Sequence, residues 1–313
     1  MTRIHERLCQ TAGDLFRIGS MIRRVYAQAP NWNTWSFARF DIWAQRRIAD
    51  ERAFGKTDWH RHVALWETGG DLAGAVLIDP REGASLIGDP DQRGLIQPML
   101  DWAEACRRAD WPPDKPFIVE AMESNTFAQE HLQARGYTRL AEHMIYREKP
   151  LGVARPEPVT LPPGFAIRIL ESPQGWLQYF DAVNAVFKFM DTVEAFEYVL
   201  QAPSAVHDLH LNVMSEQGEL AAFCSVWIDH QNNFAEFEPV GTVPTFQKRR
   251  LTSALLAEAS NRLRAMGCSR VTVFSWSESV GANRLYEGAG LEVKDRVRNW
   301  ASCTLIPAMP SRI

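Results

Sequence analysis

The chain has 313 residues, 46% of them hydrophobic and 23% charged, which is long enough for two globular domains that each bury a core. Its formal net charge of −4 argues against a nucleic-acid partner held by bulk positive charge. The five cysteines lack C-x-x-C or metal-ligand spacing, so neither a structural zinc site nor any other metal centre is expected.

No stretch approaches the roughly 20 apolar residues that a membrane-spanning helix needs. The opening run MTRIHERLCQTAGDLFRIGSMIRR interrupts its apolar residues with charge every few positions, unlike a secretory signal. We therefore expect a cytoplasmic protein with no membrane partner.

The first half of the chain predicts alternating strands and helices. Residues 31–43, NWNTWSFARFDIW, carry aromatic side chains at helical spacing, which we expect to pack in the core or between the halves. The predicted elements that follow are strands over 60–68 and 72–79, a helix over 95–109, a strand over 117–121 and a helix that closes at residues 134–137.

A proline-rich segment divides the chain. Pro150, Pro156, Pro158, Pro162 and Pro163 prevent both helix and central strand, which is typical of a semi-rigid linker. We therefore expect an N-terminal domain at 1–149, a linker at 150–164 and a C-terminal domain at 165–313.

The second half predicts a meander and two helices. Three β-rich runs at 208–216, 219–230 and 233–244 are separated by turn residues and indicate antiparallel strands. A helix follows, with a buried stripe and an end at Gly267. The stripe consists of Leu251, Leu255, Ala259, Leu263 and Met266. A strand at 270–276, a short helix within 279–290 and a strand at 291–302 complete the half.

The two halves share one order of elements. Aligning the glycines that end their last helices gives an offset of 290 − 136 = 154, which also places Val273 on Val119. A two-residue adjustment places Arg250 on Gly94. The predicted fold class is therefore α/β with mixed sheets, in two tandem domains that each have a mostly antiparallel sheet flanked by helices.

The loop before the long helix has the layout of an anion site. Backbone N–H groups at a helix start lack intrahelical partners and attract a phosphate. The basic triplet Lys248, Arg249 and Arg250 has the wrong sign for a free helix N-terminus but the right sign for an anion bound there. The alternative interpretation is an ordinary solvated charge cluster.

The run VPTFQKRRLTSALL, a long helix, the strand VTVFSW and ANRLYEGAGL together resemble the GNAT superfamily of acyl-coenzyme A-dependent N-acyltransferases. The arrangement is similar to that of its tandem two-domain members, such as mycothiol synthase. The resemblance covers residues 165–303 well and residues 1–149 in outline. Of the three positions of the family's loop pattern, Gln247 matches, whereas Arg250 and Thr252 stand where the family has small residues.

The resemblance implies acetyl-coenzyme A as co-substrate and a set of residues that bind it. These are Thr242, Val243, Gln247, Lys248, Arg249, Arg250, Leu251, Thr252, Ser253 and Asn283. It further implies that Tyr286, on one helix face with Asn283, protonates the departing thiolate, for which a tyrosine is suitably protonated at neutral pH. The alternative for Tyr286 is a helix aromatic that packs on the sheet.

Two strand glutamates are candidates for the base that deprotonates the amine. Glu236 and Glu238 have the same parity and share one face of a regular strand, where either can act directly or through water. The alternative is that they are solvated or hold a substrate cation. Pro239 and Gly241 then predict a bulge, and the resemblance implies that N–H groups near Thr242 and Val243 hold the acyl carbonyl.

The offset places Tyr286 on Leu132 and Asn283 on Gln129, so the first half lacks the acid and is expected to be a degenerate GNAT-like domain. The predicted function is acyl transfer, with acetyl as the expected group, to a primary amine of a small molecule by direct attack in a ternary complex. The alternatives are a non-catalytic acyl-coenzyme A-binding or regulatory module and a protein-directed acetyltransferase. Two interpretations remain for four aromatic residues: they line an acceptor pocket, or they pack in the core. These residues are Phe223, Trp227, Phe234 and Trp276.

Overall fold

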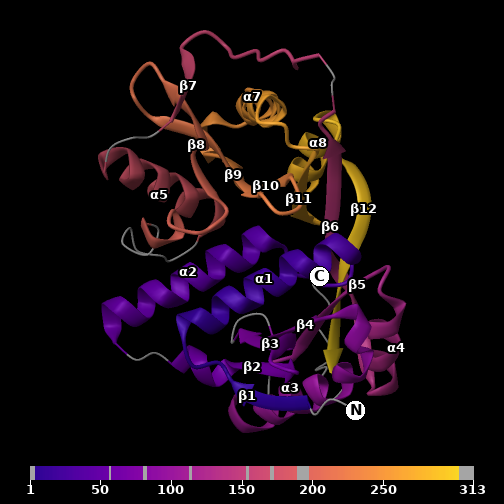
Figure 1. Cartoon of the computed structure of the whole chain (residues 1–313). Coiled ribbons are helices and arrows are strands. Elements are labelled where there is room, and N and C mark those ends of the chain that lie inside the picture. The colour runs from indigo at the N-terminus through magenta and orange to yellow at the C-terminus, as the bar shows by residue number, and fades with distance from the viewer. Residues whose placement is uncertain are drawn as a thin grey trace, which may run out of the picture.

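The computed structural model describes residues 4–55, 58–79, 83–112, 115–152, 155–169, 173–188 and 197–302. These residues form one mixed sheet of twelve strands with helices packed on both faces (Figure 1). The predicted α/β class is confirmed.

The first half of the chain contributes six strands to this sheet. Its elements are β1 (Ile4–Leu8), α1 (Ala12–Gln28), α2 (Phe37–Phe54), η1 (Asp58–His62), β2 (Val63–Thr68), β3 (Asp71–Asp79), β4 (Gly83–Gly88), η2 (Pro90–Leu95), α3 (Ile96–Asp110), β5 (Ile118–Met122), α4 (Thr126–Ala134) and β6 (Tyr137–Pro150).

The second half contributes the other six strands. Its elements are β7 (Phe165–Ile169), α5 (Pro173–Phe187), β8 (Ala205–Ser215), β9 (Leu220–Asp229), β10 (Phe234–Thr242), η3 (Pro244–Phe246), α7 (Leu251–Ala265), β11 (Arg270–Trp276), α8 (Val280–Gly288) and β12 (Glu292–Ser302). The predicted antiparallel meander is confirmed as β8, β9 and β10.

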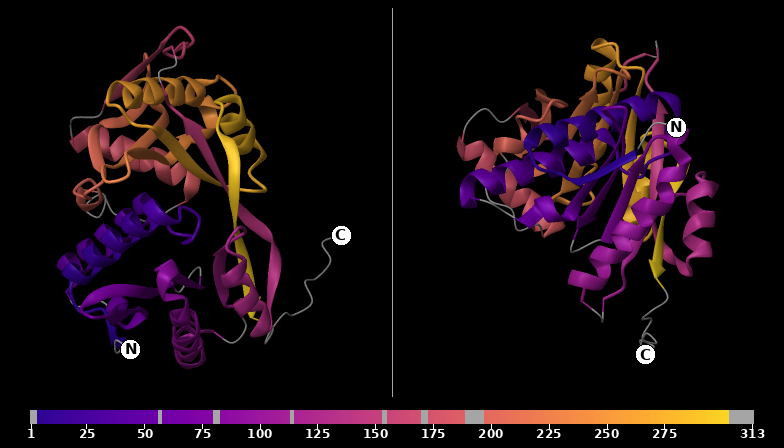
Figure 2. Two further views of the ribbon diagram at one scale, coloured as in Figure 1. Left: turned by 45° about the vertical axis from the view of Figure 1, so that its right-hand side comes forward. Right: turned by 60° about the horizontal axis from the view of Figure 1, so that its bottom comes forward.

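The two long strands β6 and β12 exchange places between the halves. The sheet order is β1-β2-β3-β4-β5-β12-β6-β11-β10-β9-β8-β7, so β12 lies between β5 and β6, and β6 lies between β12 and β11. Both strands run along the length of the molecule (Figure 2). The two predicted sheets are therefore one continuous sheet. The domain boundaries stay a prediction, because residues 292–302 pair with β5 and β6 of the first half.

Both halves have the same internal order. Neighbouring strands are antiparallel except for β4 with β5 and β10 with β11, which are parallel. Each parallel pair is joined by a connection that contains a helix, α3 in the first half and α7 in the second. The repeated plan predicted from the sequence is thus visible in the strand order.

Helices α1 and α2 of the first half pack on the sheet of the second half. Trp35 and Phe37 belong to the same buried core as Trp227 and Phe234. The ring centroid of Phe234 lies 4.4 Å from that of Tyr26 and 5.0 Å from that of Phe37. The aromatic run of the first half is therefore buried between the halves, as expected.

Polar contacts fix the position of α2 on the second half. The Ser36 hydroxyl donates to Glu236 at 2.7 Å. The Ser204 hydroxyl donates to Asp41 at 2.6 Å, and Arg23 pairs with the same carboxylate at 2.6 Å. Because all these partners are buried or half-buried, the halves meet in a defined register.

Two predicted elements differ in detail. The strand predicted from residue 60 begins at Val63, because residues 58–62 form the 3₁₀ helix η1, in which the rings of Trp59 and His60 stack at 3.6 Å between centroids. The stripe of α7 ends before Met266, whose side chain is 50% exposed. The predicted helix end is confirmed by Gly267, which has a φ of 80°.

The proline-rich connection lies against α7. Its described residues between β6 and β7 form no helix or strand. Glu157 pairs with Lys149 at 2.6 Å and with Arg264 at 2.5 Å, and its backbone exchanges two hydrogen bonds with Asn261. The connection is thus anchored to α7 at Glu157.

Because β12 pairs with both halves, damage to it should weaken the whole sheet. Val297 is fully buried and pairs with Met122 of β5 and Met144 of β6. We expect Val297→Ala to lower the free energy of unfolding by about 1–3 kcal/mol. Urea unfolding followed by tryptophan fluorescence and circular dichroism should still show one transition.

The matched control is Val293→Ala, since Val293 lies on the same strand but is 40% exposed. It should change the free energy of unfolding by less than about 0.5 kcal/mol. Two separate transitions, with only one of them shifted by Val297→Ala, would show that the halves are independent.

Candidate active site

The sheet opens between β10 and β11. These parallel strands pair from Phe234 to Glu236 opposite Arg270 to Thr272, and the described residues beyond show no further pairs. On the other side of β10, the register with β9 shifts between Phe237 and Val240. The predicted bulge is therefore present, and it bends β10 away from β11.

Gly241 permits this bend by its small size. A Cβ atom there would lie 2.4 Å from the ring of Phe223 on β9. Any side chain would therefore push the strands apart. The glycine is needed for close approach to the ring and fixes where β10 ends.

The loop after β10 and the start of α7 form an uncapped helix N-terminus. Within the described residues no side chain caps this helix, whose N-cap residue is Arg250. Gln247, Lys248, Arg249, Arg250 and Ser253 are exposed, whereas Leu251 and Thr252 are buried. The first N–H groups of α7 thus face solvent beside a basic cluster, which is the geometry of an anion site.

The three cations of the loop, Lys248, Arg249 and Arg250, differ in whether their side chains contact other residues. The Arg249 guanidinium lies over the rings of Phe165 and Phe246, at 5.8 and 5.6 Å from their centroids. Lys248 and Arg250 have no side-chain partner among the residues that the structure describes. These two side chains therefore remain to contact an anion.

The loop backbone adopts a conformation that glycine favours. Lys248 has a φ of 65° and Arg250 a φ of 59°, both in the left-handed region. This conformation costs about 1–2 kcal/mol for a residue with a Cβ atom. Arg250 is thus strained where the resembling family has a glycine, and its charge is gained at a cost in backbone energy.

Three predicted cofactor residues already have partners. The Thr242 and Thr252 hydroxyls hydrogen-bond to each other and fasten the end of β10 to the first turn of α7. The Val243 N–H donates to the Ala221 carbonyl at 3.0 Å. This N–H is therefore used within the sheet and is not free to hold an acyl carbonyl.

Asn283 uses its whole side chain to shape a turn. Its amide NH₂ donates to the carbonyls of Trp276 and Ser277, each at 3.1 Å, and its oxygen accepts from Ser275 at 2.9 Å. In the first half, Gln129 donates to the carbonyls of Met122 and Glu123. The offset of 154 relates these two sets of contacts, so the amide holds the strand-to-helix turn in both halves.

Tyr286 points from α8 into the core of the second half. It is 5% exposed, and its hydroxyl hydrogen-bonds to none of the described residues. Burial raises the pKa of this phenol, and the negative charge of Glu238 raises the pKa further. Tyr286 is therefore protonated at neutral pH and lies within electrostatic reach of Glu238.

The two candidate bases lie in different surroundings. Glu236 is 2% exposed and accepts hydrogen bonds from Ser36 at 2.7 Å and Thr272 at 3.4 Å. Burial raises the pKa of Glu236 to about 8 despite these bonds. Glu238 is half-buried, and burial raises its pKa to about 7 against the charges of Arg39 and Arg46. Glu238 is thus the more accessible carboxylate and titrates nearest neutral pH.

The four aromatic residues considered for an acceptor pocket differ in how exposed their side chains are. Phe223, Trp227 and Phe234 are at most 1% exposed and belong to buried clusters, so they are core. Trp276, at the end of β11, is 44% exposed. Of the four, it is the one whose side chain can meet an acceptor.

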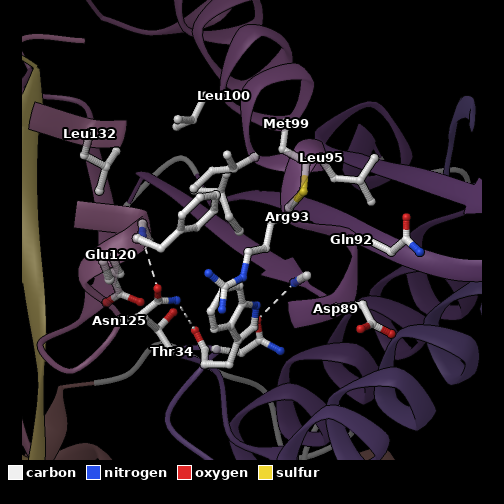
Figure 3. Close-up of a pocket in the computed structure, with 18 residues that line it drawn as sticks. Thr34, Asp89, Gln92, Arg93, Leu95, Met99, Leu100, Glu120, Asn125 and Leu132 are labelled. Atoms are coloured by element: carbon white, nitrogen blue, oxygen red, sulfur yellow. Dashed lines mark hydrogen bonds between the residues drawn. The ribbon is translucent and has the colours of Figure 1, made fainter. Parts of the chain in front are cut away.

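The equivalent opening in the first half has different chemistry. Figure 3 shows the cavity there, with Leu132 at the position of Tyr286 and with Asn125, Glu120 and Thr34 around it. Gly94 has no left-handed φ, and acidic Asp89 caps the helix start through the Asp91 N–H at 3.0 Å. This opening therefore lacks the tyrosine of the second half, and its lining includes the cation Arg93, whose guanidinium lies over the rings of Trp32 and Phe127.

Sequence reasoning missed two residues of α2 that reach the second half. Ser36 is the N-cap of α2, accepting the Arg39 N–H at 3.1 Å while donating to Glu236. The positive charge of Arg39 lowers the pKa of Glu238. The N-cap is visible in the sequence as a serine before FARF, but its partner 200 residues away is not.

Within the described residues, no group of three or more His, Cys, Asp or Glu side chains is arranged to hold a metal ion. None of the helices in the described ranges is long and apolar enough to cross a membrane.

Comparison with known proteins supports the resemblance. Residues 176–291 match the model of the Acetyltransferase (GNAT) family. A search of curated proteins found no match. Many solved structures are similar, among them a GCN5-related N-acetyltransferase from Sphaerobacter thermophilus, at 20% identity and a TM-score of 0.63, over 96% of this chain and 95% of that one.

Two further solved structures are similar to this chain over nearly its whole length. A tandem GNAT protein from the clavulanic acid biosynthesis pathway gives a TM-score of 0.62 at 15% identity, over 97% of this chain and 100% of its own. An acetyltransferase of the GNAT family from Colwellia psychrerythraea gives 0.61 at 9% identity, over 95% and 99%. At such identities the likeness shows the fold. Residues 176–291 therefore match the GNAT acetyltransferase family model, within a chain whose fold is similar to that of a tandem GNAT protein.

Proposed function

We propose that the chain is an acyl-coenzyme A-dependent N-acyltransferase, with acetyl as the transferred group and a primary amine of a small molecule as the acceptor. The observation that carries this proposal is that Tyr286 shares a buried core with residues of β10 and β11, and that Glu238 lies on β10 just past the point where these strands stop pairing. The negative charge of Glu238 also raises the pKa of Tyr286. An acid and a base then face one opening in the sheet.

The residues around the opening fit coenzyme A as co-substrate. The uncapped start of α7, with Lys248 and Arg250 beside it, can hold a pyrophosphate. When bound, the co-substrate supplies a thioester for the amine to attack. The chain's own task is to orient this group between β10 and β11 and to move two protons.

Each proton has a donor or an acceptor in the chain. Glu238 takes a proton from the ammonium of the acceptor, for which a pKa of about 7 is well suited. Tyr286 donates its phenolic proton to the sulfur that departs, and the second proton that the nitrogen loses on becoming an amide returns the phenolate to its neutral form. The attack is direct, and the buried state of Cys224, which raises the pKa of its thiol, supports a path without a cysteine nucleophile.

The cover provided by α2 supports a small acceptor. Ser36, at the N-cap of this helix, donates a hydrogen bond to the Glu236 carboxylate on β10. A protein chain would need this side of the sheet to be open. A non-catalytic acyl-coenzyme A-binding module stays an alternative, which the following variants distinguish.

Removal of the Tyr286 hydroxyl should impair turnover and leave the fold intact. Because the hydroxyl bonds to none of the described residues, Tyr286→Phe should fold normally. We expect kcat to fall on the order of 100-fold in a thioester-consumption assay with an amine panel. Tyr137→Phe, which alters a buried tyrosine of the first half, is the control. Binding of acetyl-coenzyme A without turnover in the wild type would favour the binding module.

The pH dependence of kcat/KM should follow the ionisation of Glu238. The base must be ionised, so kcat/KM should rise with pH and level off above a pKa of about 7. Glu238→Gln should remove this limb and lower the plateau by roughly 10- to 100-fold. If the limb persists in Glu238→Gln but disappears in Glu236→Gln, the base is Glu236 instead.

Two variants of Arg250 separate its charge from its backbone strain. Arg250→Gly and Arg250→Ala both remove the cation and should weaken acetyl-coenzyme A binding several-fold, less so at high salt. Only the glycine variant relieves the left-handed conformation, so it should be about 1 kcal/mol more stable than the alanine variant. Unchanged or tighter binding of acetyl-coenzyme A by Arg250→Gly in calorimetric titration would show that the arginine is merely tolerated.

A further inference from the structure

We propose that the cavity of the first half is a binding site for a short-chain carboxylate. The cavity lies between β4, β5, α3 and α4 (Figure 3), where the parallel strands β4 and β5 pair at Ala84 and Val119. It corresponds in position to the candidate active site of the second half. Its wall combines unpaired hydrogen-bond donors with apolar side chains, so its ligand differs from the acyl-coenzyme A proposed for the second half.

Two polar groups of the cavity wall are buried and have no hydrogen-bond partner among the described residues. They are the Thr34 hydroxyl and the side-chain NH₂ of Asn33. Thr34 is 3% exposed and lies beside Glu120 and Asn125 (Figure 3). The Asn33 oxygen accepts the Gly88 N–H at 3.0 Å, so the unpaired end of this amide is the one that donates. Because buried polar groups are nearly always hydrogen-bonded, these two groups indicate a ligand that accepts from them.

The two carboxylates of the wall already have cationic partners. Asp89 pairs with Arg24 of α1 at 3.2 Å. Glu120 pairs with Arg39 of α2 at 3.3 Å. Both arginines lie outside the lining of the cavity, so they balance the two negative charges without contributing a cation to the interior.

Arg93 is the cation of the cavity wall, and it has no acidic partner in the part of the chain that the structure describes. Its guanidinium lies 5.5 Å from the ring centroid of Trp32 and 5.3 Å from that of Phe127. These two rings stack on each other, with 6.1 Å between their centroids. The ring contacts hold the guanidinium in place and leave its charge unneutralised, which favours an anionic ligand.

The rest of the wall is apolar and limits the size of the ligand. Leu95, Met99, Leu100 and Leu132 line the cavity away from Thr34 (Figure 3). The cavity has a volume of about 50 Å³. One water needs roughly 10–15 Å³ on this measure, so the space holds a carboxylate with a chain of about two to four carbons.

A carboxylate matches the unpaired groups of this wall better than an amine or a coenzyme A. The Arg93 guanidinium, the Asn33 NH₂ and the Thr34 hydroxyl can all donate, and a carboxylate accepts at both oxygens. An amine would bring a second positive charge to Arg93. A pyrophosphate would meet the negative charge of Asp89, which caps the start of η2.

The test is a titration of the full chain with acetate, propionate and butyrate, followed by calorimetry and by NMR of protein labelled with ¹⁵N-asparagine. We expect one site per chain and a shift of the Asn33 side-chain signal, which Asn33→Ser assigns. Because the chain packs on apolar side chains, each added methylene should strengthen binding about three- to fourfold. Butyramide, which has the shape of butyrate without its charge, should bind at least about 10-fold more weakly.

Two variants remove one donor each, and each has a matched control. Arg93→Gln should weaken butyrate binding on the order of 10-fold, and Thr34→Val about 3- to 10-fold. Both should fold, since neither side chain has a hydrogen bond or ion pair to another described residue. The controls should bind butyrate like the wild type. They are Arg52→Gln, which removes an exposed guanidinium 5.2 Å from the Tyr198 ring, and Thr68→Val, which removes another buried hydroxyl without a partner.

The inference is overturned if butyrate shows no saturable binding, if butyramide binds equally well, or if Arg93→Gln and Thr34→Val bind butyrate like their controls. Weaker binding in Arg250→Ala but not in Arg93→Gln would also refute it, because the carboxylate would then lie at the start of α7. A second equivalent of acetyl-coenzyme A that is lost in Arg93→Gln would show that the cavity holds the co-substrate instead.

Discussion

The backbone pairing of β6 and β12 holds the molecule together. Each of these strands ends one half of the chain, and each is inserted between strands of the other half. Their mutual ladder extends from Glu292 opposite Glu148 to Ser302 opposite Tyr137. Since a sheet transmits its twist and spacing through such ladders, the position of β11, and with it the opening beside β10, depends on a strand of the first half.

Both halves contribute residues to the candidate site, because the pairing of β6 with β12 brings the halves together. The second half supplies the bulge in β10, the basic start of α7 and Tyr286, and the first half supplies α2 as a cover with Ser36 and Arg39. Burial brings the pKa of Glu238 to about 7, against the charges of Arg39 and Arg46 on α2. A low-dielectric enclosure and a fixed cation act against each other, which is how a carboxylate comes to titrate near neutral pH.

Local patterns in the sequence predicted the local structure well. The meander, the long helix ending at Gly267 and the bulge after Glu238 are each encoded by residues that are near one another in the sequence. The exchange of β12 was not predicted, because nothing in LEVKDRVRNWAS distinguishes pairing with β5 from pairing within its own half. The role of Ser36 was missed for a similar reason: its hydrogen bond to Glu236 joins residues that are 200 positions apart in the chain. The left-handed backbone of Arg250 was also beyond the sequence, since arginine gives no signal for a positive φ.

The exchanged strands bear on the evolutionary history of a duplicated chain. After an ordinary duplication, a copy that no longer performs the reaction is free to be lost. Here each half completes the sheet of the other, so deletion of the first half would strip β11 and β12 of the strand between them. Selection therefore retains the first half as part of the scaffold of the second, whatever becomes of its own cleft.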